Sequence, residues 1–171
     1  MAPHIFMGNG LSRSSLLGWP GVAALAVLAL DQLTKFMVYT IWPIPGENEL
    51  VVIPGFFSLV HWRNLGAAWG IFARHTWLLA VVSLAAAVLL MLFFRRLSDG
   101  KPVLAMTYGV LLGGIVGNLI DRAFFPEGVV DFLAFRWWPA FNIADSAITC
   151  SVIFLIVHAV FFERDGEKPA E

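Results

Sequence analysis

Four long runs without a charged side chain constrain this sequence more than any other feature. Each run is at least 17 residues long, and the runs comprise residues 14–30, 75–94, 102–120 and 146–162. A helix that crosses the hydrocarbon core of a membrane needs roughly 17–25 apolar residues. Charged residues form only 13% of the chain, whereas a soluble domain contains about 25%. We therefore predict an all-α membrane protein, a single integral membrane domain whose four transmembrane helices span residues 18–39, 76–94, 102–120 and 144–162.

The segment between the first two helices, residues 40–75, has the composition of a small sheet. Its stretches Leu50–Ile53 and Phe56–Trp62 are rich in β-branched and aromatic residues and flank a Pro54-Gly55 turn signal. We expect a β-rich hairpin here, outside the membrane and close to its surface. Indole rings are typical of that depth, which suits Trp62, Trp69 and Trp77.

The other connecting and terminal segments are predicted to lack regular structure. Residues 121–143 form a loop rich in Phe and Trp between the last two helices, and residues 1–17 and 163–171 form tails. With four helices, this loop and the β-rich segment lie on one side of the membrane and both termini lie on the other side.

The link between the second and third helices orients the chain. Arg95, Arg96 and Lys101 crowd into it, and cytoplasmic links are typically rich in Arg and Lys. Over the whole chain the bias is small, with six basic residues on the side of the termini and five on the other. We place both termini in the cytoplasm because the link is compact. The first run could also be a cleaved signal peptide, but no small-x-small site follows Leu30, so we expect it to be retained.

Polar and ionisable side chains gather at the outer ends of the predicted helices and in the outer segments. They are Asp31, Lys35, Asn64, Asn118, Asp121, Arg122, Asp131, Asn142 and Asp145. An ionisable group at the centre of a membrane costs roughly 2.5–3.5 kcal/mol, so such groups are presumed to be functional. The four carboxylates of this set are therefore candidates for a site.

Two pairs in this set also have purely structural interpretations. Asp31 and Lys35 are four residues apart, so they can form an ion pair that only closes the end of the first helix. In the functional interpretation the same pair orders the segments around a site. Asn142 and Asp145 fit a capping box at the start of the fourth helix, which would place Asp145 at the positive end of the helix dipole.

The third predicted helix carries glycines at four-residue spacing. Gly109, Gly113 and Gly117 form a face of small residues on which another helix can pack closely. Asp121 continues this spacing, so we expect it to point into the bundle rather than into lipid.

Asp131 and Asp145 together predict a specific chemistry. Asp131 lies in the apolar stretch Val129–Phe132; taken alone it could be an exposed turn residue, whereas burial would raise its pKa. Two neighbouring carboxylates in unlike surroundings share one proton, so that one activates a water molecule and the other protonates a carbonyl oxygen. Such a pair hydrolyses a peptide bond without a covalent intermediate.

Other chemistries have less support in the sequence. The only cysteine, Cys150, lies in an apolar run, where we expect a buried and inert thiol. The four histidines lack metal-ligand spacing, and no glycine-rich phosphate loop or basic stripe is present. We therefore predict no metal, no cofactor and no nucleic-acid partner.

Five sequence blocks resemble the lipoprotein signal peptidases, or type II signal peptidases. In order, the blocks are Asp31–Lys35, Asn64–Gly70, Gly113–Arg122, Val129–Phe132 and Phe141–Asp145. Two features depart from the family pattern: Trp69 stands where Phe is expected, and the stretch between Asp131 and Asp145 is short.

The resemblance implies a role for each matched residue. Asp131 and Asp145 would be the catalytic pair. The residues that support this pair or bind substrate would be Asp31, Lys35, Asn64, Gly66, Asn118, Asp121, Arg122, Asn142 and Ala144.

The resemblance also implies a substrate and a location. The substrate would be a prolipoprotein with a diacylglyceryl group on its cysteine, cut just before that cysteine. The enzyme would be a multi-pass protein of the bacterial inner membrane, a monomer in contact with membrane lipids, with its active site near the periplasmic face.

Two other classes of protein stay open on the residues alone. A small transporter would carry protons on Asp31 or Asp121, and it predicts an essential carboxylate near the middle of a helix and inverted repeats. A scaffold subunit with structural ion pairs predicts that Asp131→Asn has almost no effect.

Overall fold

A bundle of four long helices makes up most of the protein. The computed structural model describes residues 15–66, 71–72, 75–98 and 100–162, so Trp69, residues 1–14 of the first predicted tail and all of the second lie outside the described residues. The helices are α1 (Ser15–Ile41), α2 (Thr76–Ser98), α3 (Pro102–Phe124) and α4 (Ile143–Phe162). All four are long and apolar enough to cross a membrane. The prediction of four transmembrane helices is therefore confirmed.

Glycines on α3 allow its neighbours to pack closely against it. A Cβ atom on Gly113 would lie 2.5 Å from the carbonyl oxygen of Ala24 in α1. A Cβ atom on Gly114 would lie 2.7 Å from the carbonyl oxygen of Ala144 in α4. Real Cβ atoms do not come so close, so only glycine permits these contacts. The predicted small-residue face of α3 is thus confirmed, and it packs against α1.

The outward faces of the helices are apolar. Leu92 on α2 and Phe161 on α4 are 72% and 68% exposed, as expected for side chains that contact lipid. Cys150 on α4 is also exposed, so the prediction of a buried thiol is wrong. An apolar run indicates apolar surroundings, but it does not distinguish the protein interior from the lipid.

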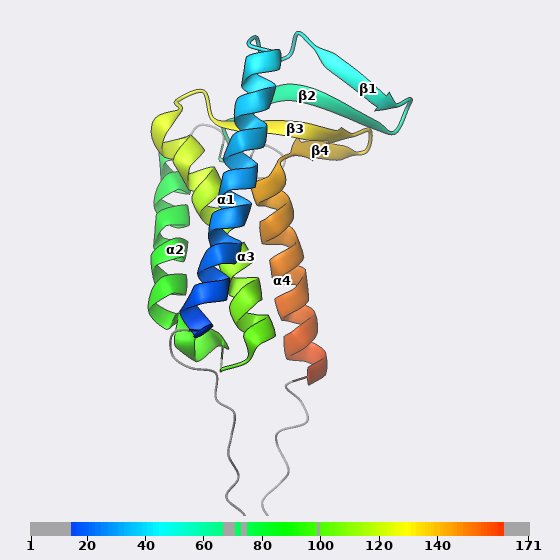
Figure 1. Ribbon diagram of the computed structural model, residues 1–171. Helices are drawn as coiled ribbons and strands as arrows, with labels where there is room; N and C mark the ends of the chain where they lie inside the picture. Colours follow the sequence, from blue (N-terminus) through cyan, green and yellow to red (C-terminus); the bar gives the residue numbers. More distant parts are fainter. Residues whose placement is uncertain (1–14, 67–70, 73–74, 99, 163–171) are drawn as a thin grey trace, which may run out of the picture.

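A four-stranded antiparallel sheet lies across one end of the bundle (Figure 1). Its strands, in spatial as well as chain order, are β1 (Glu49–Ile53), β2 (Phe57–Asn64), β3 (Val129–Phe135) and β4 (Trp138–Phe141). The expected hairpin between the first two helices is confirmed: β1 pairs with β2, and Gly55 at the turn has a positive φ of 72°. The strands β3 and β4 come from the segment between α3 and α4, where the sequence predicted only a loop.

Pairing between β2 and β3 joins the two outer segments into one sheet. Leu59 lies opposite Leu133, and Trp62 lies opposite Asp131, with an irregular register between these pairs. The sheet rests on the bundle through Val38 of α1, Val130 and Phe132 of β3. Asp131 is thereby held on the strand next to the start of α4.

The helix α3 extends past its predicted end at residue 120. It continues to Phe124 and so includes Asp121 and Arg122. We predicted an end at the first charged residue, but Asp121 has a cationic partner inside the bundle, so its charge does not require the helix to leave the membrane.

Candidate active site

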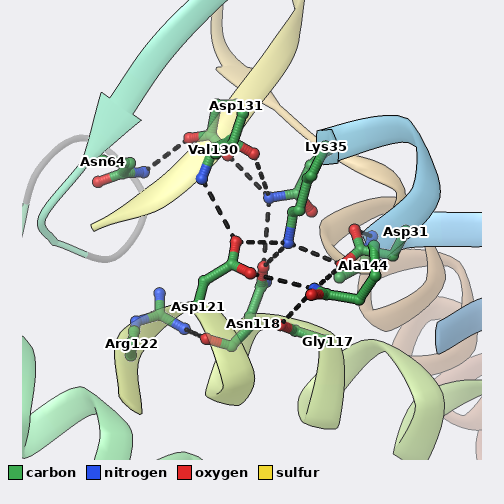
Figure 2. Close-up of polar contacts among 12 residues, drawn as sticks. Asp31, Lys35, Asn64, Gly117, Asn118, Asp121, Arg122, Val130, Asp131 and Ala144 are labelled. Atoms are coloured by element: carbon green, nitrogen blue, oxygen red, sulfur yellow. Dashed lines mark hydrogen bonds and ion pairs between the residues drawn. The ribbon is translucent and has the colours of Figure 1, made fainter. Parts of the chain in front are cut away.

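A buried ion-pair cluster joins α1 to α3 (Figure 2). The ammonium nitrogen of Lys35 lies 2.7 Å from Asp31 Oδ2 and 2.9 Å from Asp121 Oδ2. Lys35 is only 4% exposed and both carboxylates are buried. The predicted pair of Asp31 and Lys35 is thus confirmed, and it contains a third member from α3. We call Asp31, Lys35 and Asp121 the ion-pair cluster.

The ion-pair cluster also holds the start of α4. The backbone N–H of Ala144 donates to Asp31 Oδ1 at 2.9 Å. The first N–H groups of a helix have no partner within the helix, so Asp31 of α1 satisfies one of them for α4. Gly117 makes this approach possible, because a Cβ atom there would lie 2.6 Å from Asp31 Oδ2.

Gln32 is a member of this region that the sequence analysis missed. Its amide nitrogen donates to Asp121 Oδ1 at 3.0 Å, to Asp31 Oδ2 at 3.2 Å and to the carbonyl oxygen of Gly117 at 3.2 Å. Its position between Asp31 and Lys35 was the available signal, but an uncharged side chain did not stand out among charged ones.

Asn142 and Asp145 form the predicted capping box at the start of α4. The backbone N–H of Asp145 donates to Asn142 Oδ1 at 2.9 Å, and the backbone N–H of Asn142 donates to Asp145 Oδ2 at 3.3 Å. This reciprocal bonding satisfies two backbone donors. It also holds the carboxyl group of Asp145 next to the first turn of α4.

The carboxyl group of Asp131 is buried and receives two hydrogen bonds. Asn64 Nδ2 donates to Oδ2 at 3.0 Å, and Asn142 Nδ2 donates to Oδ1 at 2.8 Å. Burial is the main cause that raises the pKa of Asp131 to about 7, and the nearby charge of Asp145 is the second. The two hydrogen bonds lower this pKa, but by less. At neutral pH the Asp131 carboxyl therefore holds a proton for a substantial fraction of the time.

The asparagines connect the two carboxyl groups to each other and to the ion-pair cluster. Asn118 Nδ2 donates to Asp145 Oδ1 at 2.7 Å, while Asn118 Oδ1 accepts from Lys35 at 3.1 Å. The side-chain amide of Asn142 donates to the carboxyl group of Asp131, and its backbone N–H donates to the carboxyl group of Asp145. One hydrogen-bond network thus reaches from α1 to the sheet and α4.

A cavity of about 470 Å³ opens beside both carboxyl groups. Asn64, Arg122, Asp131 and Asp145 supply its charged and amide groups, and the rest of its wall is largely apolar, from β4 and from α4 as far as Cys150. Arg122 Nη2 donates to the carbonyl oxygen of Gly66 at 3.2 Å. This linkage ties the end of α3 to the segment after β2.

The residues that the sequence singled out therefore meet in one place. Hydrogen bonds and ion pairs connect all of them, namely Asp31, Lys35, Asn64, Gly66, Asn118, Asp121, Arg122, Asp131, Asn142, Ala144 and Asp145. A larger cavity of about 630 Å³ lies on the sheet, and none of these residues lines it. The smaller cavity is therefore the candidate active site.

Comparison with known proteins gives the family. A family model described as Signal peptidase (SPase) II matches residues 23–161. A lipoprotein signal peptidase of Symbiobacterium thermophilum is 38% identical over 149 residues, which cover 85% of this chain and 96% of that protein. A lipoprotein signal peptidase of Moorella thermoacetica is 45% identical over 132 residues, which cover 77% of this chain and 86% of that protein.

Two solved structures share the fold. A bacterial membrane enzyme determined by the in meso method at 2.3 Å resolution superposes with a TM-score of 0.80 and 31% identity, over 91% of this chain and 94% of that one. A second, at 1.9 Å resolution, gives a TM-score of 0.74 and 32% identity, over 86% of this chain and 95% of that one. Because the family model and these relatives match most of its length, the chain belongs to the signal peptidase II family, the family of the lipoprotein signal peptidases.

Proposed function

We propose that this protein is an aspartyl endopeptidase in which Asp131 and Asp145 are the catalytic residues. Membership of the signal peptidase II family makes it a peptidase that removes signal peptides from lipoproteins. The observation that carries the aspartyl mechanism is that the buried carboxyl group of Asp131 on β3 and the partly buried carboxyl group of Asp145 on α4 line one cavity and share Asn142 as a hydrogen-bond partner.

The two carboxyl groups would work as a pair with one shared proton. The ionised carboxylate accepts a proton from a water molecule, whose oxygen then bonds to the scissile carbonyl carbon. The protonated carboxyl donates its proton to the carbonyl oxygen, which gives a tetrahedral diol. As the carbon–nitrogen bond breaks, the carboxyl that took the proton of water gives it to the leaving amine, and the other carboxylate takes back a proton from the diol. The pKa of about 7 for Asp131 supports such a mixed state at neutral pH.

The shape of the cavity supports a lipid-bearing substrate. Its wall runs along α4 from Asp145 to Thr149 and Cys150, and Cys150 is exposed on the membrane-spanning helix. The acyl chains of a diacylglyceryl-modified cysteine could stay in the bilayer while the peptide bond before that cysteine reaches the two carboxyl groups. We propose cleavage at that bond.

The proposed setting follows from the same arrangement. The protein is a multi-pass protein of the bacterial inner membrane. We propose that it acts as a monomer with both termini in the cytoplasm and the active site near the periplasmic face. The sheet and the start of α4 would then lie at the outer surface of the membrane.

Cleavage of matched lipidated and unlipidated peptides tests the proposed substrate. With the purified protein in detergent, we expect kcat/KM to be at least about 100-fold higher for the diacylglyceryl peptide, since burial of only four methylene groups contributes about 3 kcal/mol. Mass spectrometry should locate the cut directly before the modified cysteine. The Asp145→Asn protein serves as the control for contaminating proteases. Equal rates for the two peptides would contradict the substrate assignment, and a cut elsewhere would contradict the cleavage position.

A further inference from the structure

The asparagines around the two carboxyl groups differ in what fixes their amide orientation. Asn64 Oδ1 accepts from the backbone N–H of Gly66, and Asn142 Oδ1 accepts from the backbone N–H of Asp145, both at 2.9 Å. A backbone N–H can only donate, so each of these side chains must turn its NH2 group toward its other partners. For both, the local chain geometry is sufficient to determine the orientation.

Within the part of the chain that the structure describes, no backbone N–H donates to the side chain of Asn118. Its Oδ1 atom accepts from Lys35 Nζ at 3.1 Å and from Asn142 Nδ2 at 3.2 Å. An ammonium group can only donate, and the NH2 group of Asn142 donates to the same oxygen, so both partners require the amide NH2 of Asn118 to face the other way. There it donates to Asp145 Oδ1 at 2.7 Å.

We propose that Lys35 is a positioning residue of the reaction, which acts through Asn118 to keep Asp145 as the ionised member of the catalytic pair. This inference rests on the aspartyl mechanism proposed above and assigns a role to each acid within it. Asp145 would be the base that accepts the proton of water, and Asp131 would be the acid that donates to the carbonyl oxygen.

The hydrogen bonds to Asp145 favour its charged form. Asn118 Nδ2 donates to one oxygen and the backbone N–H of Asn142 donates to the other. Hydrogen bonds that donate to a carboxylate stabilise its charge, and the start of α4 adds the positive end of a helix dipole. If the amide of Asn118 were reversed, its oxygen would face Asp145 Oδ1 and the charge would be destabilised.

The charged groups around Asp145 come from three other elements. Arg122 of α3 and Lys35 of α1 are positive, and Asp131 of β3 is the other member of the pair. Asp31 and Asp121 belong to the ion-pair cluster, in which each binds Lys35 directly. Lys35 can therefore affect Asp145 in two ways, through its charge and, together with Asn142, through the orientation of Asn118.

A charge-matched double variant separates this role from a purely structural one. Lys35→Met with Asp121→Asn removes the ammonium group and one carboxylate, so the net charge of the ion-pair cluster is unchanged and Asp31 can still accept from Ala144. Asp121→Asn alone is the matched control, because it leaves Lys35 bound to Asn118 and Asp31. The measurement is kcat/KM for the lipidated peptide across the pH range.

We expect the acid limb of the pH profile to move upward by about one pH unit in the double variant, because Asp145 loses the nearby positive charge of Lys35 and Asn118 loses one of the two donors that orient its amide. In Asp121→Asn alone, the acid limb should stay in place or move to lower pH, since a negative charge is removed. A merely structural role of Lys35 would lower the rate at every pH without moving the limb. An acid limb at the same pH in the two variants would overturn the proposal.

Asn118→Ala provides a second test that leaves every ion pair in place. It removes the donor to Asp145 and should also move the acid limb upward, so the test holds even if the double variant does not fold. An acid limb at the wild-type pH would overturn the proposal. The Asp145→Asn protein tests the aspartyl mechanism separately from the positioning role of Lys35. Activity in Asp145→Asn would contradict the aspartyl mechanism, whereas an inactive Asp145→Asn with an unmoved limb in Asn118→Ala contradicts only the positioning role.

Discussion

Asp131→Asn and Asp145→Asn are each expected to lower kcat/KM for a lipidated peptide by at least about 1000-fold, since positioned proton transfer contributes about 10²–10⁴-fold. Asparagine has the shape of aspartate but can neither accept the proton of water nor donate one to the carbonyl oxygen. Both carboxyl groups lie in the same cavity and each carries out one of the two proton transfers, so loss of either stops the reaction. The measurement is the initial rate of peptide cleavage by purified protein in detergent.

Two controls make this prediction specific. The thermal unfolding of both variants should show an intact fold, because asparagine still fills the space of the carboxyl group. Glu127→Gln removes an exposed carboxylate just before β3 and should leave the rate unchanged. A scaffold subunit would tolerate both substitutions, so more than a tenth of the normal rate in either variant would contradict the catalytic assignment.

Lys35→Met should lower the free energy of unfolding by about 3–5 kcal/mol, the typical effect of removing one partner from a buried ion pair. The substitution keeps the apolar length of the side chain but leaves Asp31 and Asp121 buried without their cation. These two carboxylates also connect α1 to the start of α4 and to α3. Thermal or denaturant unfolding in detergent measures the loss.

The same chain offers a rescue and a control for this effect. Adding Asp121→Asn to Lys35→Met should recover much of the stability, because only one carboxylate then stays without a cation. Arg136→Met, at an exposed position in the turn between β3 and β4, should change the stability by less than about 0.5 kcal/mol. If Lys35→Met were as stable as Arg136→Met, the ion-pair cluster would not contribute to the fold as described.

The membrane-spanning part of the fold could be predicted because one physical requirement dominates it. Apolar length alone identified α4 to within one residue and the start of α2, which continues to Ser98, four residues past its predicted end. The hairpin of β1 and β2 was predictable since Pro54 and Gly55 mark its turn. The second hairpin has Arg136 and Trp137 at its turn, which carry no such signal. The pairing of β3 with β2 joins residues far apart in the chain, and local patterns do not predict such contacts.

The composition of the candidate site was predictable for a related reason. Charged and amide groups are costly near the hydrocarbon of the membrane, so Asp31, Asp121 and Asn118 stood out against an apolar background. Their partners were harder to predict. Asp121 was expected to point into the bundle, but its ion pair with Lys35 depends on how α1 and α3 pack together. Gln32 escaped notice because neutral polar residues in helices are common.

The geometry also bears on the transporter alternative. That alternative predicted an essential carboxylate near the middle of a helix, but Asp121 and Asp145 lie in the last and first turns of α3 and α4. Asp31 lies deeper in α1, where Lys35 neutralises it and Ala144 binds it. These acids are engaged in fixed contacts, as the peptidase assignment requires.

The pH dependence of kcat/KM for wild-type protein tests most directly whether two acids share one proton. Asp131 has a pKa raised to about 7 by burial and by the charge of Asp145, and it must be protonated to act as the acid. As the pH rises through this value the proton is lost, so the rate should fall above about pH 7, approaching tenfold for each further pH unit. A rate that stays constant or increases up to about pH 9 would contradict the account.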